Sequence, residues 1–319
     1  MHHDRDLLLR SDILTNWQDH YSEVFSEHTL ILQHRLQDLP HFRRENLIAL
    51  IEKAPDDVYD LVRMGAVGSN KHQWRRGFKE GTSGEDILTA IEEGRFWISL
   101  QGLQDWDEGF AQVTEKIFAD IARKVPTFKS FKHKTGMLIS SPGAQVYYHM
   151  DIPGQSLWQI QGEKDVYVYP NSEPFLKDKQ MENVFLGVTE EEIEYHDWYD
   201  DFADKITLKP GMMAHWPLNC PHRVENHDMV NISLTTEHYT KEIRDHYVTL
   251  YANGILRGMG ISPEKNSAGA SKYAKMAIAA AHKMVFRKVV KAKSPKAPRS
   301  FKINLKGEDF MEDASSAAG

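Results

Sequence analysis

Residues 143–170 constrain the fold of this chain more strongly than any other stretch. A Gly162-Glu163 turn, typical of a β-hairpin, lies between two runs in which apolar and polar residues alternate. His149 and Asp151 lie two positions apart in the first part of the stretch. Side chains at positions i and i+2 of a strand point to the same side, so we expect the imidazole and the carboxylate to share one face.

A second segment, residues 209–222, ends in His222. Two histidines and one carboxylate on adjacent strands suit divalent iron, because three ligands on one face leave the other coordination positions open. The alternative is that His149 and Asp151 form an ordinary cross-strand pair and that His222 is a surface loop residue. Another His-x-Asp match, at residues 2–4, lies in a polar N-terminus without a strand pattern, and we interpret it as coincidental.

At these residues the chain resembles the JmjC-like, cupin-type oxygenases that use iron(II) and 2-oxoglutarate, and most of all the hydroxylase branch that includes factor inhibiting HIF. The resemblance covers about residues 131–240. It implies that His149, Asp151 and His222 bind iron(II) and form the catalytic centre. The aspartate favours hydroxylation, because the related halogenases lose this carboxylate to admit halide.

The resemblance also implies how the cosubstrate 2-oxoglutarate is held. Lys164 lies thirteen residues after the aspartate, as in that branch, and is expected to pair with the distal carboxylate of 2-oxoglutarate. Gln155 falls where the branch has an asparagine near the cosubstrate. Val146 stands where a threonine is expected, so one hydrogen bond to the cosubstrate must come from elsewhere. Tyr147 and Thr235 are the candidates for that hydrogen bond.

The composition is that of a soluble globular protein, with 41% hydrophobic and 27% charged residues in a chain of 319. A net charge of −7 argues against a general nucleic-acid binder, because neutralising phosphates needs a basic surface. One cysteine, Cys220, excludes an internal disulfide framework and fits a reducing compartment. The charged N-terminus does not resemble a signal peptide, and no apolar stretch approaches the ~20 residues that span a bilayer. We therefore expect a cytoplasmic protein.

The order of short strands and turns predicts an all-β core with helical flanks. Residues 131–240 are predicted to form a double-stranded β-helix, a jelly-roll or cupin barrel. Residues 1–130 are predicted to be a mainly helical region packed on the barrel, with one strand at 95–103. Residues 241–291 are predicted to form C-terminal helices, and the Lys-, Pro- and Ser-rich residues 292–319 a flexible tail.

A long connection follows the hairpin, and its last part, residues 189–204, is rich in carboxylates. They are Glu190, Glu191, Glu192, Glu194, Asp197, Asp200, Asp201 and Asp204. The simplest interpretation is a solvated loop. The alternative is an acidic lip at the mouth of the barrel that attracts a cationic substrate. We interpret His196, His215 and His227 as surface or hydrogen-bonded histidines.

Three functions are compatible with these residues. The first is an iron(II)- and 2-oxoglutarate-dependent dioxygenase that hydroxylates a protein or peptide side chain with O2. The second is the same chemistry on a small metabolite, and the third is a metal-binding cupin that is not an oxygenase. Lys164 separates the first two from the third, because an isomerase has no need of a partner for a keto-diacid there. The apolar positions of the C-terminal helices also predict a homodimer.

Overall fold

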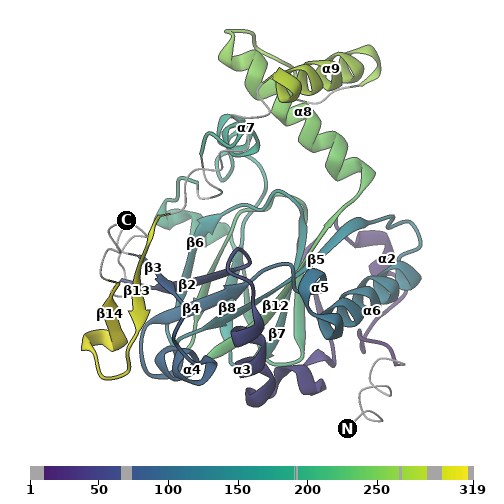
Figure 1. Cartoon of the computed structure of the whole chain (residues 1–319). Coiled ribbons are helices and arrows are strands. Elements are labelled where there is room, and N and C mark those ends of the chain that lie inside the picture. The colour runs from purple at the N-terminus through teal and green to yellow at the C-terminus, as the bar shows by residue number, and fades with distance from the viewer. Residues whose placement is uncertain are drawn as a thin grey trace.

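The computed structural model describes residues 11–65, 74–189, 191, 193–265, 268–285 and 297–314 (Figure 1). Within these residues the strands form one ten-stranded sheet and one four-stranded sheet. The strands are β1 (Leu30–Gln33), β2 (Tyr59–Arg63), β3 (Arg75–Phe78), β4 (Phe96–Leu100), β5 (Phe131–Ser140), β6 (Gln145–His149), β7 (Gly154–Gln161), β8 (Lys164–Val168), β9 (Asp204–Leu208), β10 (Met212–His215), β11 (His222–Asn226), β12 (Asn231–Tyr239), β13 (Arg299–Ile303) and β14 (Met311–Asp313).

Helices surround these sheets. They are α2 (Tyr21–Val24), α3 (Arg44–Lys53), α4 (Gly84–Glu93), α5 (Leu103–Trp106), α6 (Glu108–Lys124), α7 (Asp178–Leu186), α8 (Lys241–Gly258) and α9 (Gly269–Val285), with short 3-10 helices η1 (Leu36–Asp38), η2 (Pro40–Phe42), η4 (Asp197–Phe202) and η5 (Glu308–Phe310). No helix in the described ranges is long and apolar enough to cross a membrane.

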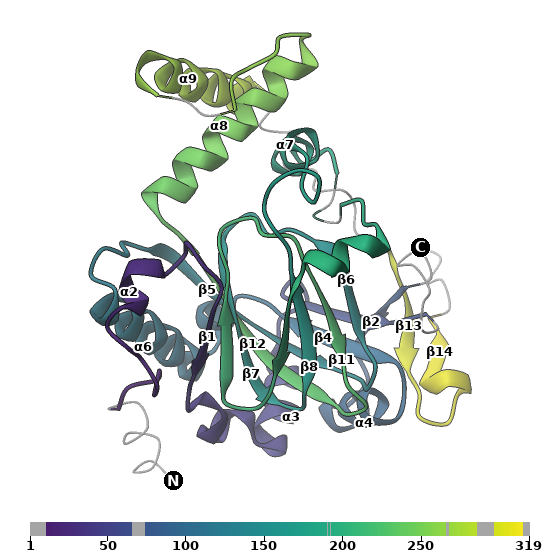
Figure 2. The same cartoon turned by 180° about the vertical axis from the view of Figure 1, so that it is seen from behind.

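Eight consecutive strands, β5 to β12, form the core of the molecule (Figure 2). β10, β7, β12 and β5 are neighbours in the larger sheet, and β6, β11, β8 and β9 make up the smaller one. Apolar side chains of both sheets meet between them, among them Leu157 of β7 and Val166, Val168 and Leu208 of β8 and β9. The predicted all-β core with helical flanks is confirmed at this level.

The turn between β7 and β8 sets the position of Lys164. Gly162 has a φ of +77°, a left-handed conformation that glycine adopts without strain. A Cβ at this position would lie 2.3 Å from the carbonyl oxygen of Val230. The close approach of these two backbone segments therefore also requires glycine. Lys164 therefore begins β8 at a fixed register, opposite Asn226 of β11 and Leu208 of β9.

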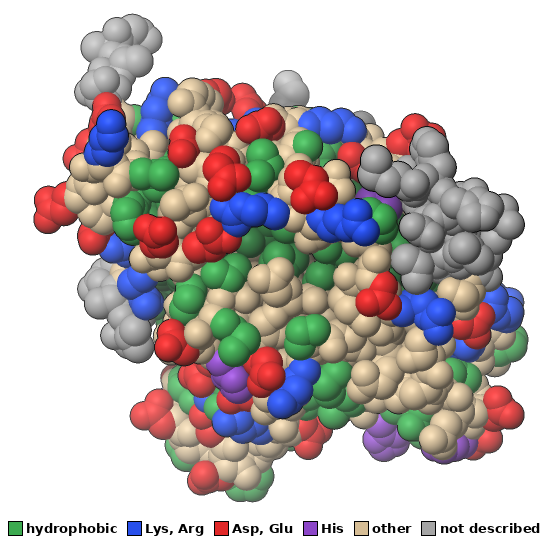
Figure 3. Space-filling view, turned by 90° about the horizontal axis from the view of Figure 1, so that it is seen from below, with side chains coloured by type: hydrophobic (Ala, Val, Ile, Leu, Met, Phe, Trp, Pro, Cys, Tyr) green, Lys and Arg blue, Asp and Glu red, His purple; other side chains and the backbone are tan. Residues whose placement is uncertain are grey.

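The outer face of the larger sheet is covered by α3, α4 and α6. Leu50 of α3, Ile91 of α4 and Ile117 of α6 are buried in one apolar cluster with Ile98 of β4 and Trp158 of β7. Apolar residues recur at helical spacing along each helix and at alternate positions along each strand. Each helix and strand therefore buries one face. Acidic and basic side chains are intermixed on the end of the molecule remote from α8 and α9 (Figure 3).

Two regions differ from the predictions. Residues 1–130 were expected to be mainly helical with one strand at 95–103, where β4 lies, but β1, β2 and β3 are also present, and β4, β2 and β3 extend the larger sheet beyond β5. Residues 299–303 and 311–313, expected to belong to a flexible tail, form β13 and β14, and β13 pairs in parallel with β3. Phe301 anchors this pair, because its buried ring fills the space that Gly77 leaves open. Residues 292–296 and 315–319 of the predicted tail lie outside the described residues.

Candidate active site

His149, Asp151 and His222 come together at one end of the smaller sheet. His149 is the last residue of β6, and His222 is the first of β11 and lies opposite it. Asp151 follows just after the end of β6. One potential ligand atom from each residue lies within 4.8 Å of the others. Nε2 of His149 lies 3.9 Å from Oδ1 of Asp151, and Nε2 of His222 lies 3.3 Å from its Oδ2. The three predicted ligands therefore form one group.

Backbone carbonyls orient both imidazoles. Nδ1 of His149 lies 2.7 Å from the carbonyl oxygen of Tyr147, and Nδ1 of His222 lies 3.1 Å from that of Cys220. A carbonyl can only accept, so Nδ1 of each neutral ring carries the proton and donates it. Nε2 of each ring then keeps its lone pair and faces Asp151. Metal-binding histidines are commonly held in this way by a carbonyl on the other ring nitrogen.

Burial makes charge costly at all three side chains. It lowers the pKa of His149, and burial and the proximity of His149 lower the pKa of His222 well below its ordinary value. Burial raises the pKa of Asp151 well above its ordinary value, and the nearby carboxylates of Glu191 and Glu237 raise it further. A divalent cation in this group would supply the positive charge that an ionised Asp151 needs.

The three residues fit a divalent metal ion. Oδ2 of Asp151 is buried, and no group in the described part of the chain hydrogen-bonds to it. Nε2 of His222 is close to this oxygen but does not have hydrogen-bond geometry. A buried carboxylate oxygen without a partner is costly, and a metal ion would satisfy it. Two imidazoles and one carboxylate are the ligand set typical of non-haem iron(II).

Lys164 lies between the two sheets, some distance along β8 from the metal-binding residues. His222 is opposite Val168, and Lys164 lies four residues before Val168, which is roughly 13 Å along a strand. Its side chain is 3% exposed. Burial alone lowers its pKa from the ordinary 10.5 to about 7, and no described carboxylate offsets this effect. Lys164 is thus a buried lysine without a counter-charge among the described residues.

Gln155 and Thr235 face the same space between the sheets. Thr235 of β12 is opposite Leu157, which belongs to the apolar cluster between the sheets. Gln155 lies two residues before Leu157 on β7 and therefore points to the same side. A Cβ on Gly136 would lie only 2.7 Å from the hydroxyl oxygen of Thr235, so the glycine makes room for this hydroxyl.

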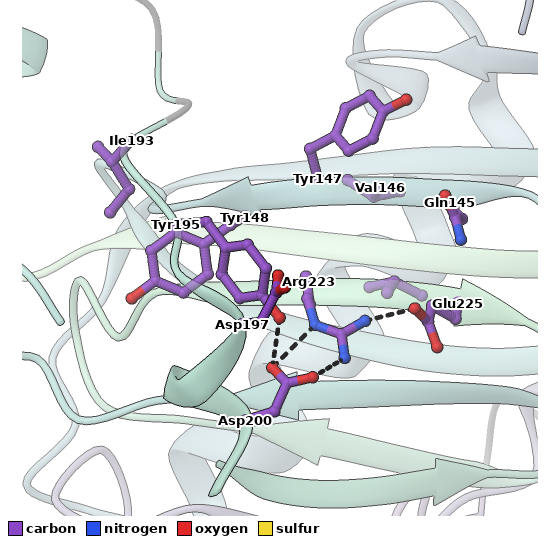
Figure 4. Close-up of a pocket in the computed structure, with 11 residues that line it drawn as sticks. Gln145, Val146, Tyr147, Tyr148, Ile193, Tyr195, Asp197, Asp200, Arg223 and Glu225 are labelled. Carbon is purple, nitrogen blue, oxygen red and sulfur yellow. Dashed lines mark hydrogen bonds and ion pairs between the residues drawn. The ribbon is translucent and has the colours of Figure 1, made fainter. Parts of the chain in front are cut away.

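Tyr147 lies elsewhere. Its ring stacks on Trp74, with ring centroids 5.1 Å apart, and it lines a pocket of about 420 Å³ together with Arg223 (Figure 4). Among the described residues, those that line this pocket include neither Lys164 nor the three metal-binding candidates. The pairing of β6 with β11 is irregular just after His222, which changes the direction of the side chains of β6. This geometry does not favour Tyr147 as a contact of the cosubstrate.

Trp97 is a candidate contact that the sequence analysis missed. It lies on β4, opposite Ser140 of β5. The hydroxyl of Ser140 accepts a hydrogen bond of 2.8 Å from the side chain of Asn226, which is opposite Lys164. The indole Nε1–H of Trp97 is buried and has no acceptor among the described residues. A buried indole N–H usually has an acceptor, so a bound ligand could supply one. The predicted strand 95–103 was the only sequence signal near it.

The carboxylate-rich residues 189–204, the acidic connection, lie beside the metal-binding candidates. The backbone N–H of Met150 donates to the carbonyl oxygen of Glu191 at 3.1 Å, and that of Ile193 donates to Tyr148 at 3.3 Å. The residues that follow are not simply a solvated loop, because they include η4. Glu190 and Glu192 lie outside the described residues, so only part of the predicted acidic lip can be located.

Arg223 fixes η4 to the outer face of β11. Its guanidinium donates to the carboxylates of Asp200 and Glu225 (Figure 4). It also donates to the hydroxyl of Tyr169 at 2.9 Å and lies 3.6 Å from the ring centroid of Tyr167. Arg223 directly follows His222, so the two side chains point to opposite faces of the strand. The acidic connection is thus fastened to the strand that carries a metal-binding candidate.

Within the described residues, the other histidines singled out in the sequence do not join the group. His215 is buried, stacks on Phe25 and hydrogen-bonds to the hydroxyls of Ser26 and Ser156. His196 and His227 are more exposed and lie near carboxylates. The His-x-Asp match at residues 2–4 lies outside the described residues.

Comparisons with known proteins find solved structures with a similar fold. No family model matches the chain, and no curated protein matches its sequence. The chain is similar in structure to Escherichia coli YcfD, with a TM-score of 0.51 and 16% identity over 89% of this chain and 69% of that one. A second structure, of YcfD as a ribosomal oxygenase in complex with cobalt and 2-oxoglutarate, has a TM-score of 0.51 and 15% identity over 87% and 69% of the two chains. At this level of identity, the likeness shows a shared fold.

Proposed function

We propose that this protein is an iron(II)- and 2-oxoglutarate-dependent dioxygenase in which His149, Asp151 and His222 bind the iron. The observation that carries this proposal is the buried group itself. Both Nε2 atoms face the carboxylate of Asp151, and its Oδ2, the oxygen nearer His222, has no hydrogen bond within the described residues. The bound iron and 2-oxoglutarate would together activate O2 for oxidation of a substrate C–H bond. The cobalt and 2-oxoglutarate bound by YcfD support this pair of ligands.

The role of Lys164 is to hold the distal carboxylate of 2-oxoglutarate. The ammonium group is buried, no described residue supplies a counter-charge, and a carboxylate beside it would satisfy both groups. The roughly 13 Å along β8 between Lys164 and the level of His222 is compatible with a five-carbon diacid that reaches from the lysine toward the metal. Thr235 and Trp97 are candidates for hydrogen bonds to the same ligand, and Gln155 is a candidate nearer the metal.

The chain's own residues would also keep water from the reacting atoms. The wall between the sheets is apolar, with Leu157, Val166 and Val224 among its buried residues. Val146, which replaces an expected threonine, is 40% exposed and lines the pocket of Tyr147 and Arg223 instead of this wall. An apolar wall excludes water and strengthens the interaction between Lys164 and a carboxylate.

We also infer the narrower assignments. The strands β5 to β12 are interpreted as a double-stranded β-helix, with the catalytic core within residues 131–240. The substrate is proposed to be a protein or peptide side chain, because the YcfD structure with a similar fold is described as a ribosomal oxygenase. Membership of the branch that includes factor inhibiting HIF stays a prediction. Hydroxylation of a small metabolite is the alternative.

A calorimetric titration with Co(II) tests the metal site directly. The unmodified protein is expected to bind one Co(II), whereas Asp151→Ala and His222→Ala lose this binding with unchanged circular dichroism. His196→Ala, at an exposed histidine on the acidic connection, is the matched control and should bind Co(II) normally. Equal Co(II) binding by the unmodified protein and His222→Ala would show that the group is not the metal site.

A further inference from the structure

Asn219 connects helix α8 to one of the proposed iron ligands. Its side-chain Nδ2 donates a hydrogen bond of 2.6 Å to the backbone carbonyl oxygen of Asp151. Its Oδ1 lies 3.1 Å from Nε2 of His246 on α8. Because Oδ1 can only accept, His246 donates this hydrogen bond. Asn219 is 5% exposed, so neither bond competes freely with water.

The backbone at Asn219 explains why this residue can join both groups. Asn219 lies in the turn between β10 and β11 and has a φ of +59°. Asparagine tolerates this left-handed conformation better than other residues with side chains. It lies three residues before His222, so one side chain connects the segments that carry two of the proposed ligands.

Asp151 needs such support because it lies beyond the end of β6. Its neighbour Met150 donates its backbone N–H to Glu191, but no pairing between β6 and β11 extends to Asp151 within the described residues. The side chain of Met150 is fully buried in an apolar cluster with Phe185 of α7 and Leu250 of α8. The segment that presents the carboxylate therefore rests on α7 and α8 as well as on Asn219.

We propose that Asn219 and His246 are positioning residues that couple helix α8 to the metal site through the backbone of Asp151. This inference rests on the proposed function, because it assigns Asp151 as an iron ligand. Partners of this kind, one contact away from a ligand, set how well the ligand is oriented before the metal binds. Coupling between two sites is reciprocal, so metal binding must also stabilise the docking of α8.

The test is Co(II) affinity in variants that remove one or both hydrogen bonds of the relay from His246 through Asn219 to Asp151. Asn219→Gly removes both hydrogen bonds without strain at positive φ, and His246→Phe removes the donor while keeping a ring beside Phe185. Each is expected to weaken Co(II) binding on the order of tenfold or more. His246→Gln offers an amide donor and should restore part of the affinity. His282→Phe on α9, which removes a histidine bonded to Tyr251, is the control and should leave the affinity unchanged.

Hydrogen exchange supplies a second readout. Co(II) should slow amide exchange in the first turns of α8 in the unmodified protein, and do so less in Asn219→Gly. If Asn219→Gly does not fold, the comparison of His246→Phe with His246→Gln decides. Equal Co(II) affinity in the unmodified protein and the folded variants would overturn the relay. Failure of the unmodified protein to bind Co(II) would instead overturn the proposed function.

Discussion

Lys164 is the residue at which the proposal separates cosubstrate binding from metal binding. It is buried between the sheets and lies well away from the three metal-binding candidates along the strand. Removing the ammonium would leave the distal carboxylate of 2-oxoglutarate buried without a partner, which costs about 3–5 kcal/mol. Lys164→Ala should therefore weaken 2-oxoglutarate binding by hundreds-fold or more while Co(II) affinity changes little. Two calorimetric titrations, with Co(II) and then with 2-oxoglutarate, check this prediction, and equal cosubstrate affinity would exclude the role.

The pKa of Lys164 gives a pH dependence with a definite sign. Burial lowers this pKa to about 7, and the carboxylate of 2-oxoglutarate pairs only with the ammonium form. Below pH 7 the ammonium is already present. Above pH 7 binding must take up a proton, so the affinity should fall about tenfold for each further pH unit. Calorimetry of the Co(II)-loaded protein in buffers of different ionisation enthalpy should detect the proton uptake. Lys164→Met should show neither the pH dependence nor the uptake.

The sequence predicted some of these residues and not others, for physical reasons. His149 and Asp151 could be paired because strand geometry relates positions i and i+2, and His222 followed from its segment. Trp97 could not be found, because a tryptophan in an apolar strand is normally a core residue. Asn219 was missed because its role depends on a contact with α8, which is distant in the sequence. Tyr147 was expected near the cosubstrate, but the irregular pairing of β6 could not be predicted from spacing.

At the scale of elements, the acidic connection gives the next prediction. Glu191 lies beside the metal-binding strand, and Asp197 lines the pocket on the outer side of β6. Glu194, in contrast, forms an ion pair with Lys177 at 3.0 Å. If the connection attracts cations, Lys- and Arg-rich peptides should stimulate 2-oxoglutarate turnover more than acidic peptides of equal length, most strongly at low salt.

The double variant Glu191→Gln, Asp197→Asn should reduce this preference and its salt dependence. Glu194→Gln is the matched control, because Lys177 already neutralises that carboxylate and its removal should change the preference less. Initial rates at two salt concentrations check the prediction. An unaltered salt profile in the double variant would exclude the acidic lip and leave the oxygenase proposal intact.

The elements themselves were predicted unevenly. The strands of the core carry alternating residues or end at turn residues, so their positions followed from sequence. β2 and β3 were missed because each is short and depends on its partners: β2 pairs with β3 and β4, and β3 also pairs with β13 near the other end of the chain. β13 was missed for the same reason, since its basic, proline-flanked sequence resembles a flexible tail and its pairing with β3 supplies the order.

At the scale of the whole molecule, the C-terminal helices predict a dimer. α8 extends away from the core, and α9 lies across α8 (Figure 1). Apolar side chains stay exposed on this pair, among them Met259, Tyr273 and Met284, each at least 70% exposed. Burying such side chains against a second copy is favourable, so we expect a homodimer through this surface. Tyr273→Glu with Met284→Glu should give a monomer in sedimentation experiments.

The control for this prediction is Phe202→Glu, which changes an exposed apolar residue on η4, away from α8 and α9. It should leave the oligomeric state unchanged. A dimer that persists in the double variant would place the interface elsewhere, and an unmodified protein that is monomeric at all concentrations would exclude the dimer.

The most direct test of the account is succinate release from 2-oxoglutarate, measured with and without iron(II). The unmodified protein is expected to release succinate only when iron(II) and O2 are both present. Asp151→Ala and His222→Ala should release none, although both stay folded. Lys164→Ala should need far more 2-oxoglutarate. Iron-dependent succinate release that persists in His222→Ala, or its absence in the unmodified protein loaded with iron(II) and 2-oxoglutarate, would contradict the proposed dioxygenase.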